Sequence, residues 1–353
     1  MSGPLPDGLR LRPLEPSDGP AIAALFAASA DTGAIRFRSE HRIDPYRALT
    51  YMGDDTGVVV ERTETGAVVA LGMWSQDEAV IRGELRPYAL LHSLGVHPDV
   101  RRQGVASAII AWRIAAVREW IGAAGFLIAT IQKSNEGSFR AASRWATQVS
   151  PPMSSIAVKM RSRPPASIDG VRVRPARVDD LAEFGDRHAA SRTDFDLWVP
   201  SDADRLAAWL ERTPVATPIH ELWLAEDRSG NLLAGVGVTV IGEISTLHVD
   251  AMPLPIRVVN TFVGIIPKSR QLERIALERA WFAPGAEAVG RHLFEAVRWE
   301  LRGRGNVVIA SFDPNGPLRA MIVAPRWLPR TAFSLAIKAE LPLRPDHPFE
   351  GVQ

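Results

Sequence analysis

The sequence has 353 residues, of which 46% are hydrophobic and 23% charged, a composition typical of a globular protein long enough for two domains. Its 41 basic and 40 acidic residues leave a net charge of +1, which argues against nucleic acid or an anionic membrane as a partner. It has no cysteine, which excludes disulfides, thiolate nucleophiles and cysteine-ligated zinc and favours a cytoplasmic location.

Hydrophobic periodicity predicts a mixed α/β order in the first half. An N-terminal strand comes before a helix that begins near Asp18, and the turn at Thr65-Gly66 joins two antiparallel strands. Neither the proline-rich N-terminus nor any apolar run fits a signal peptide or a membrane span. The predicted strands are 9–14, 58–62, 68–74, 88–96, 126–131 and 156–160, and the later helices are 105–121 and 136–145.

The second half repeats the first. Arg12-Pro13 and Asp18 recur in register as Arg174-Pro175 and Asp180, and the segment "IATIQKSNEGSFRA" resembles the later "IASFDPNGPLRA". Between the two copies, residues 161–169 are rich in proline and polar side chains, as in an exposed linker. We therefore expect an N-terminal domain over residues 1–162 and a C-terminal domain of the same fold over 163–353.

The stretch "GVHPDVRRQGVA", residues 95–106, links the predicted strand 88–96 to the helix that starts at Val105. The first amides of a helix have no intrahelical acceptor and favour anions. Arg101 and Arg102 add positive charge, Gly104 and Ala106 let a bulky anion approach the backbone, and Ser107 offers a hydroxyl. The pattern predicts a phosphate cradle, with a plain arginine-rich helix cap as the alternative.

This stretch resembles the phosphate loop of the GNAT superfamily of N-acetyltransferases, because Arg101, Gly104 and Ala106 match its Q/R-x-x-G-x-G/A pattern. The resemblance implies two tandem GNAT-like domains, each a mixed, mostly antiparallel twisted sheet flanked by helices, and acetyl-CoA or another acyl-CoA as co-substrate without a metal. The implied cofactor-binding residues are Leu94, Gly95, Val96, Arg101, Arg102, Gln103, Gly104, Val105, Ala106, Ser107, Asn135 and Ser138. Asn135 also fits a simple helix N-cap.

In the second half, the segment "WFAPGAEAVGRHL" has Pro284 where the first half has Pro98, but the cations before its glycine are missing. The helical stripe that includes Val289, Leu293 and Val297 remains. The second half therefore keeps the fold with a degenerate motif, and a second acyl-CoA site, held by backbone amides alone, stays an open alternative.

Transfer to an amine needs a base, because alkylamines are protonated at neutral pH. His92, on the strand before the cradle, is the best candidate, against a half-buried structural histidine; Glu84 is the weaker one. The GNAT pattern implies a tyrosine as general acid seven residues after Asn135, where this chain has Ala142, so Tyr88 or Ser138 would substitute.

The resemblance places the acceptor pocket near residues 31–51. Arg36, Arg38, Arg42 and Arg47 lie in this segment and would suit an acidic acceptor, unless they form a solvated face. We expect an N-acyltransferase, acetylating a primary amine of a small molecule or peptide in a ternary complex, as a monomer or homodimer. The alternative is a non-catalytic acyl-CoA-binding or regulatory protein, which the missing tyrosine favours.

Overall fold

A computed structural model describes residues 5–29, 36–51, 55–322, 324, 328–344 and 347–350. The first half contains β1 (Leu9–Pro13), α1 (Gly19–Ala28), β2 (Arg36–His41), α2 (Pro45–Thr50), β3 (Thr56–Arg62), β4 (Val68–Ile81), β5 (Glu84–Val96), α3 (Val105–Ala116), α4 (Arg118–Ile121), β6 (Phe126–Gln132), α5 (Glu136–Ala142), β7 (Gln148–Val149) and β8 (Met153–Lys159).

The second half contains β9 (Arg172–Pro175), α6 (Leu181–Ala190), α7 (Ala203–Glu211), β10 (His220–Glu226), β11 (Leu232–Thr239), β12 (Ser245–Ala251), α8 (Leu254–Val263), β13 (Gln271–Leu272), β14 (Arg274–Phe282), α9 (Glu287–Glu300), β15 (Val307–Phe312), α10 (Leu318–Met321) and β16 (Arg330–Lys338). The predicted α/β order is confirmed, although the expected helix 105–121 breaks at Val117 into α3 and α4. None of the helices that the structure describes is long and apolar enough to cross a membrane.

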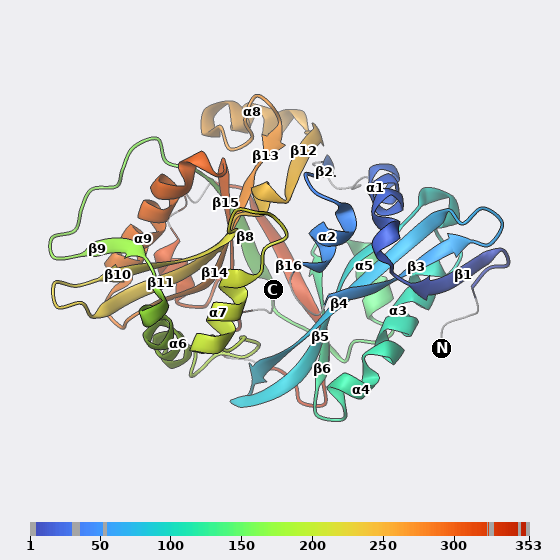
Figure 1. Cartoon of the computed structure of the whole chain (residues 1–353), viewed down its shortest axis with the longest axis horizontal. Helices are drawn as coiled ribbons and strands as arrows, with labels where there is room; N and C mark the ends of the chain where they lie inside the picture. The colour runs from blue at the N-terminus through green and yellow to red at the C-terminus, as the bar shows by residue number, and fades with distance from the viewer. Residues whose placement is uncertain are drawn as a thin grey trace.

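The two halves share one 13-stranded sheet, in the order β1-β3-β4-β5-β6-β16-β8-β15-β14-β11-β10-β9, with β7 beside β16. Each half gives its last long strand to the other: β8 pairs with β15, and β16 pairs with β6. Figure 1 shows the halves side by side, with β16 and β8 between them. Main-chain hydrogen bonds thus run across this junction without a break, and the two halves form one continuous sheet.

Helices cover both faces of the sheet in the first half. Val59 and Leu71 face α1, whereas Val58, Val60 and Ala70 face α3, as expected when side chains alternate along a strand. A Cβ atom on Gly72 would approach a methyl carbon of Ile109 to 2.3 Å, so glycine is required where α3 crosses β4.

The sequence repeat has an electrostatic basis. Arg12 donates to both Asp18 and Glu61, and Arg174 makes the same pair of contacts with Asp180 and Glu226. Each arginine joins the first strand of its half to the following turn and to the neighbouring strand. The hydrogen bonds from Arg174 lower the pKa of Asp180, so this carboxylate stays ionised.

Candidate active site

The backbone of β5 is distorted beside the centre of the sheet. His92 lies opposite Met73 and Gly95 lies opposite Leu71, so β5 holds one more residue than β4 over this stretch. Ser93 within this bulge has a φ of 48°, which is uncommon for a residue with a side chain. Such a conformation persists only where the surrounding structure holds it.

A buried arginine on α3 holds the bulge in place. Arg113 is 2% exposed and donates to the carbonyl oxygens of Met73, at 2.8 Å, and His92, at 3.0 Å. Burial lowers the pKa of Arg113 to about 10, still far above neutrality, so it remains a cation. The role of Arg113 was not predicted, although an arginine close to the apolar Ile109 and Ile110 on one predicted helix is a sequence signal of a buried charge.

The strands β5 and β6 separate where the bulge begins. Their parallel pairing covers only residues 88–90 of β5 and 126–128 of β6. Beyond it opens a groove of about 340 Å³, lined on one side by residues 91–94 and on the other by 129–131, with Asn135, Ser138 and Trp145 from the next segment. We call this the interstrand groove. The opening between the two strands thus begins after Leu90, before the predicted cofactor-binding residues Leu94, Gly95 and Val96.

The loop that the sequence predicts as a phosphate cradle lies immediately before α3. Arg102 and Gly104 have φ values of 63° and 87°, and the amides of residues 102–106 find no acceptor among the described residues. A Cβ atom on Gly104 would meet nothing within 4 Å, so the space above the loop is open. Free amides at the start of a 12-residue helix are the groups that an anion would need here.

The side chains around the cradle divide their roles. Arg101 donates to the carbonyl of Val96, and Gln103 donates to that of Asp99, so both stabilise the loop itself. Ser107 receives a hydrogen bond of 2.9 Å from Arg144, which brings an unpredicted cation to the cradle. Asn135 caps α5 by accepting from the amide of Ser138, so the simple N-cap interpretation is confirmed, while the same residue also lines the interstrand groove.

A second cavity, of about 410 Å³, lies between the two halves. Its lining includes Asp55, Asp77 and Tyr88 from the first half and Glu278 and Arg279 from the second. We call this the central cavity. His92 lines both the central cavity and the interstrand groove, so the imidazole lies where the two meet.

Asp55 lies beside His92 in the central cavity. Its carboxylate is 3% exposed, and its Oδ1 lies 3.3 Å from Nε2 of His92, while Nδ1 of the imidazole lies 3.1 Å from the hydroxyl of Ser93. Neither Oδ2 of Asp55 nor Nε2 of His92 completes a hydrogen bond of good geometry within the described part of the chain. Two neighbouring side chains of this cavity thus each keep a buried polar atom without a hydrogen bond. Asp55 was not predicted, because no motif surrounds it.

The structure does not bring Glu84 to this site. It lies at the opposite end of β5, where its exposed carboxylate pairs with Arg86. Tyr88 lines the central cavity and not the interstrand groove, and burial raises its pKa well above the ordinary value. Ala142 lines the groove at the position of the missing tyrosine.

The arginines near the first helices mainly connect the two halves. Arg42 pairs with Glu273, Arg38 with Asp250, and Arg47 donates to the carbonyl of Pro214. None of them lines the central cavity, which α2 reaches only through Ala48 and Leu49. Arg36 lies on β2, and residues 31–35 of the expected acceptor segment lie outside the described residues.

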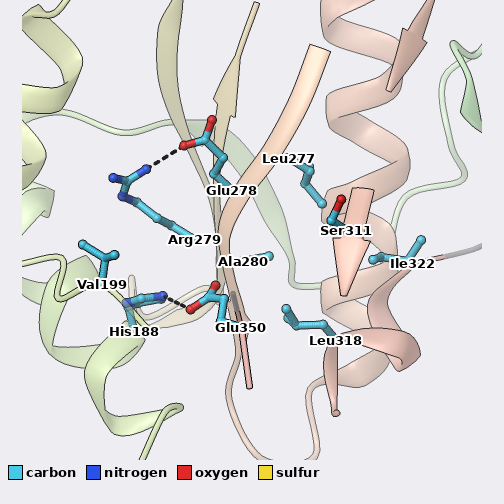
Figure 2. A pocket seen from close by; sticks show the side chains of 10 residues that line it. All are labelled: His188, Val199, Leu277, Glu278, Arg279, Ala280, Ser311, Leu318, Ile322 and Glu350. Carbon is cyan, nitrogen blue, oxygen red and sulfur yellow. Dashed lines mark hydrogen bonds and ion pairs between the residues drawn. The ribbon is translucent and has the colours of Figure 1, made fainter. Parts of the chain in front are cut away.

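The corresponding groove of the second half is filled. Arg279 has a φ of 49°, close to the 48° of Ser93, and the pairing of β14 with β11 shifts by one residue here as that of β5 with β4 does. Glu278 on β14 therefore occupies the position that His92 has on β5. Figure 2 shows His188 in contact with Glu350 in the pocket that Glu278, Arg279 and Leu318 also line, and the cavity left there is only about 60 Å³. Arg192, 1% exposed, pairs with Glu350 and donates to the carbonyl of Ala280.

Comparison with known proteins supports this description. Residues 27–144 match the acetyltransferase (GNAT) family, and no match to a curated protein was found. The fold resembles *Saccharomyces cerevisiae* N-myristoyltransferase with bound myristoyl-CoA, at 12% identity and a TM-score of 0.65, over 96% of this chain and 85% of that one. It also resembles a GCN5-related N-acetyltransferase from *Sphaerobacter thermophilus*, at 16% identity and a TM-score of 0.55, over 97% and 98%. The resemblance expected from the sequence is thus confirmed as a family match over residues 27–144, and the whole chain shares the fold of these solved acyltransferases.

Proposed function

We propose that the protein transfers an acyl group, acetyl in the simplest case, from acyl-CoA to a primary amine of a small molecule or peptide. The observation that carries this proposal is the position of His92 between the interstrand groove and the central cavity. A base at this junction touches both reactants at once, as direct transfer in a ternary complex requires.

The first half has the features needed to bind acyl-CoA. The amides of residues 102–106, together with Arg102 and Arg144, would hold the pyrophosphate. The interstrand groove would take the pantetheine arm, since the unpaired backbone of β5 beyond Leu90 offers it hydrogen-bonding groups. Asn135 and Ser138 line the same groove and lie beside this arm in the proposal.

The central cavity is lined by three carboxylates, those of Asp55, Asp77 and Glu278, beside Arg212 and Arg279, and these carboxylates favour a cationic acceptor. Asp77 pairs with Arg205 and Glu278 with Arg279, each at 2.8 Å, whereas Asp55 has only the neighbouring imidazole among the groups that the structure describes. A protonated amine could donate a hydrogen bond to Oδ2 of Asp55, which has no partner among the described residues. This arrangement replaces the expectation of an acidic acceptor, because the arginines on which it rested bind the other half.

The proposed chemistry begins when His92 takes a proton from the bound amine, with Asp55 stabilising the imidazolium that forms. The neutral nitrogen attacks the thioester carbonyl and the C–N bond forms, which leaves one surplus proton on the nitrogen. The C–S bond then breaks, and this proton is transferred to the departing thiolate. Of the two predicted proton donors, only Ser138 lines the interstrand groove, so we assign its hydroxyl to relay that proton from the nitrogen to the thiolate. Tyr88, kept protonated by burial, would instead donate a hydrogen bond to the acceptor in the central cavity.

The proposal is tested by measuring thiol release from acetyl-CoA, and then from longer acyl-CoAs, across a panel of amines. We expect His92→Gln to lower kcat by about 10²- to 10⁴-fold with acetyl-CoA affinity unchanged. His292→Gln, on the distant helix α9, is the matched control and should keep full activity. Equal kcat in the native and His92→Gln proteins would reject the role of His92.

The rival function is a non-catalytic acyl-CoA-binding protein, which the replacement of the expected tyrosine by Ala142 favours. Saturable acetyl-CoA binding without thiol release for any amine or acyl donor would select it over the transferase.

A further inference from the structure

The second half carries an insertion that the first half lacks. In the first half, β4 and β5 are joined by the two residues Arg82 and Gly83. In the second half, the equivalent strands β11 and β14 are separated by residues 240–273, which form β12, α8 and β13. β12 pairs with β2 of the first half, and Figure 1 shows α8 lying beyond the end of the central strands. The insertion therefore adds a cover over the junction of the two halves.

Beneath this cover lies a cavity of about 220 Å³, which we call the apolar cavity. Side chains of α8 and of the small sheet form its roof, and β8, β14 and β15 form its floor. Its apolar lining includes Phe37, Ile156, Leu247, Ile256, Val263 and Ile309. An apolar cavity of about 150 Å³ is enough to hold a benzene-sized molecule, so this one has room for a ring and a short chain.

Among the residues that the structure describes, Arg274 is the one cationic side chain in the lining of the apolar cavity. It donates to the hydroxyl of Ser245 at 3.2 Å, and its buried Nε has no hydrogen-bond partner among the described residues. The adjacent Glu273 pairs with Arg42, and Glu278 on the same strand pairs with Arg279. Within the described ranges, Arg274 thus has no carboxylate partner.

A guanidinium in apolar surroundings is costly unless an anion pairs with it. Burial lowers the pKa of Arg274, a direction that reflects this desolvation, yet arginine does not lose its proton in proteins. The planar guanidinium fits a carboxylate, which it can bind through two parallel hydrogen bonds. The lining and the cation together therefore define a ligand with an apolar body and one negative end.

We propose that the apolar cavity is a binding site for a small apolar carboxylic acid, such as an arylalkanoic or short branched aliphatic acid, with its carboxylate on Arg274. The site is separate from the central cavity, because Arg274 lines only the apolar cavity and His92 does not line it. Binding here does not depend on the proposed acyltransferase activity.

Calorimetry with 3-phenylpropionate and the neutral 3-phenylpropan-1-ol on the native chain tests the site. The two probes share their apolar body, so their difference reports the contact with Arg274. We expect saturable binding of the acid, at least about tenfold tighter than the alcohol, because a hydrogen bond to a charged group contributes about 1.5–3 kcal/mol. No saturable binding of the acid, or equal affinity for both probes, would overturn the proposal.

Two variants locate the site. Arg274→Met keeps the length of the side chain without its charge, and should abolish the preference for the acid while leaving the alcohol affinity unchanged. Arg257→Met removes an exposed cation from α8 and should keep the preference. A preference that survives in Arg274→Met would place binding elsewhere and reject the assignment. The comparison of the two probes on the native chain decides the proposal even if Arg274→Met fails to fold.

Discussion

The cradle makes a quantitative prediction at Gly104, whose φ of 87° any replacement must adopt. That conformation costs a non-glycine residue about 1–2 kcal/mol. No further cost from crowding is expected, because a Cβ atom there meets nothing within 4 Å. Gly104→Glu also places a carboxylate close to the proposed pyrophosphate. At about 4 Å the repulsion between two unit charges is about 1 kcal/mol in water and about 4 kcal/mol near a protein surface. Acetyl-CoA affinity should therefore fall by about 5- to 1,000-fold.

Gly83 provides the matched control for this experiment. It has a φ of 81°, its Cβ would also meet nothing within 4 Å, and it lies in the turn at the other end of β5. Gly83→Glu and Gly104→Glu should lower the free energy of unfolding by similar amounts in urea titrations. Only Gly104→Glu should weaken acetyl-CoA binding in calorimetry. Equal affinity in the two variants would refute the phosphate-binding role of the loop.

Three further predictions concern the number of acetyl-CoA sites, the pH dependence of stability and the exchange of strands between the halves. Calorimetric titration should give one acetyl-CoA per chain, because Arg192 and Glu350 fill the second groove; a stoichiometry of two would contradict this. Burial, together with the charges of Arg279 and Arg212, lowers the pKa of His220 from 6.5 to about 3. Between these two values the imidazole is protonated in the unfolded chain and neutral in the folded chain. Stability should fall by about 1.4 kcal/mol per pH unit from about pH 6 towards 3, and His220→Gln should flatten this loss in thermal melts. Because β8 and β16 are exchanged, residues 1–162 expressed alone should lack a cooperative unfolding transition, which co-expression with residues 163–353 should restore.

Local signals in the sequence identified the parts of the fold that depend on neighbouring residues. The repeat of Arg12 and Asp18 as Arg174 and Asp180 marked two equivalent halves, and the structure shows that each arginine makes the same contacts. The glycine and arginines before Val105 marked the cradle for the same reason, since a tight turn and a helix start are specified within a few residues.

Features that depend on distant residues could not be predicted in this way. The exchange pairs β16 with β6 across more than half of the chain and β8 with the distant β15, and nothing in either exchanged strand specifies its partner. Asp55 reaches His92 only because β3 and β5 flank β4, and the arginines of β2 meet their partners only when β12 lies alongside. Such contacts follow from topology, which a local pattern does not encode.

The same backbone bulge has different consequences in the two halves. In the first half it carries His92 and the small Ser93, and the groove beside it stays open. In the second half the equivalent residues are Glu278 and Arg279, which pair with each other, and the Arg279 guanidinium lies 4.4 Å from the ring of Trp209. These side chains line the central cavity together with His92. If acyl transfer occurs in the central cavity, the second half contributes by lining the acceptor site, and the reaction does not need a second acyl-CoA groove. Substitutions at Glu278 should then change KM for the amine and leave acyl-CoA affinity unchanged.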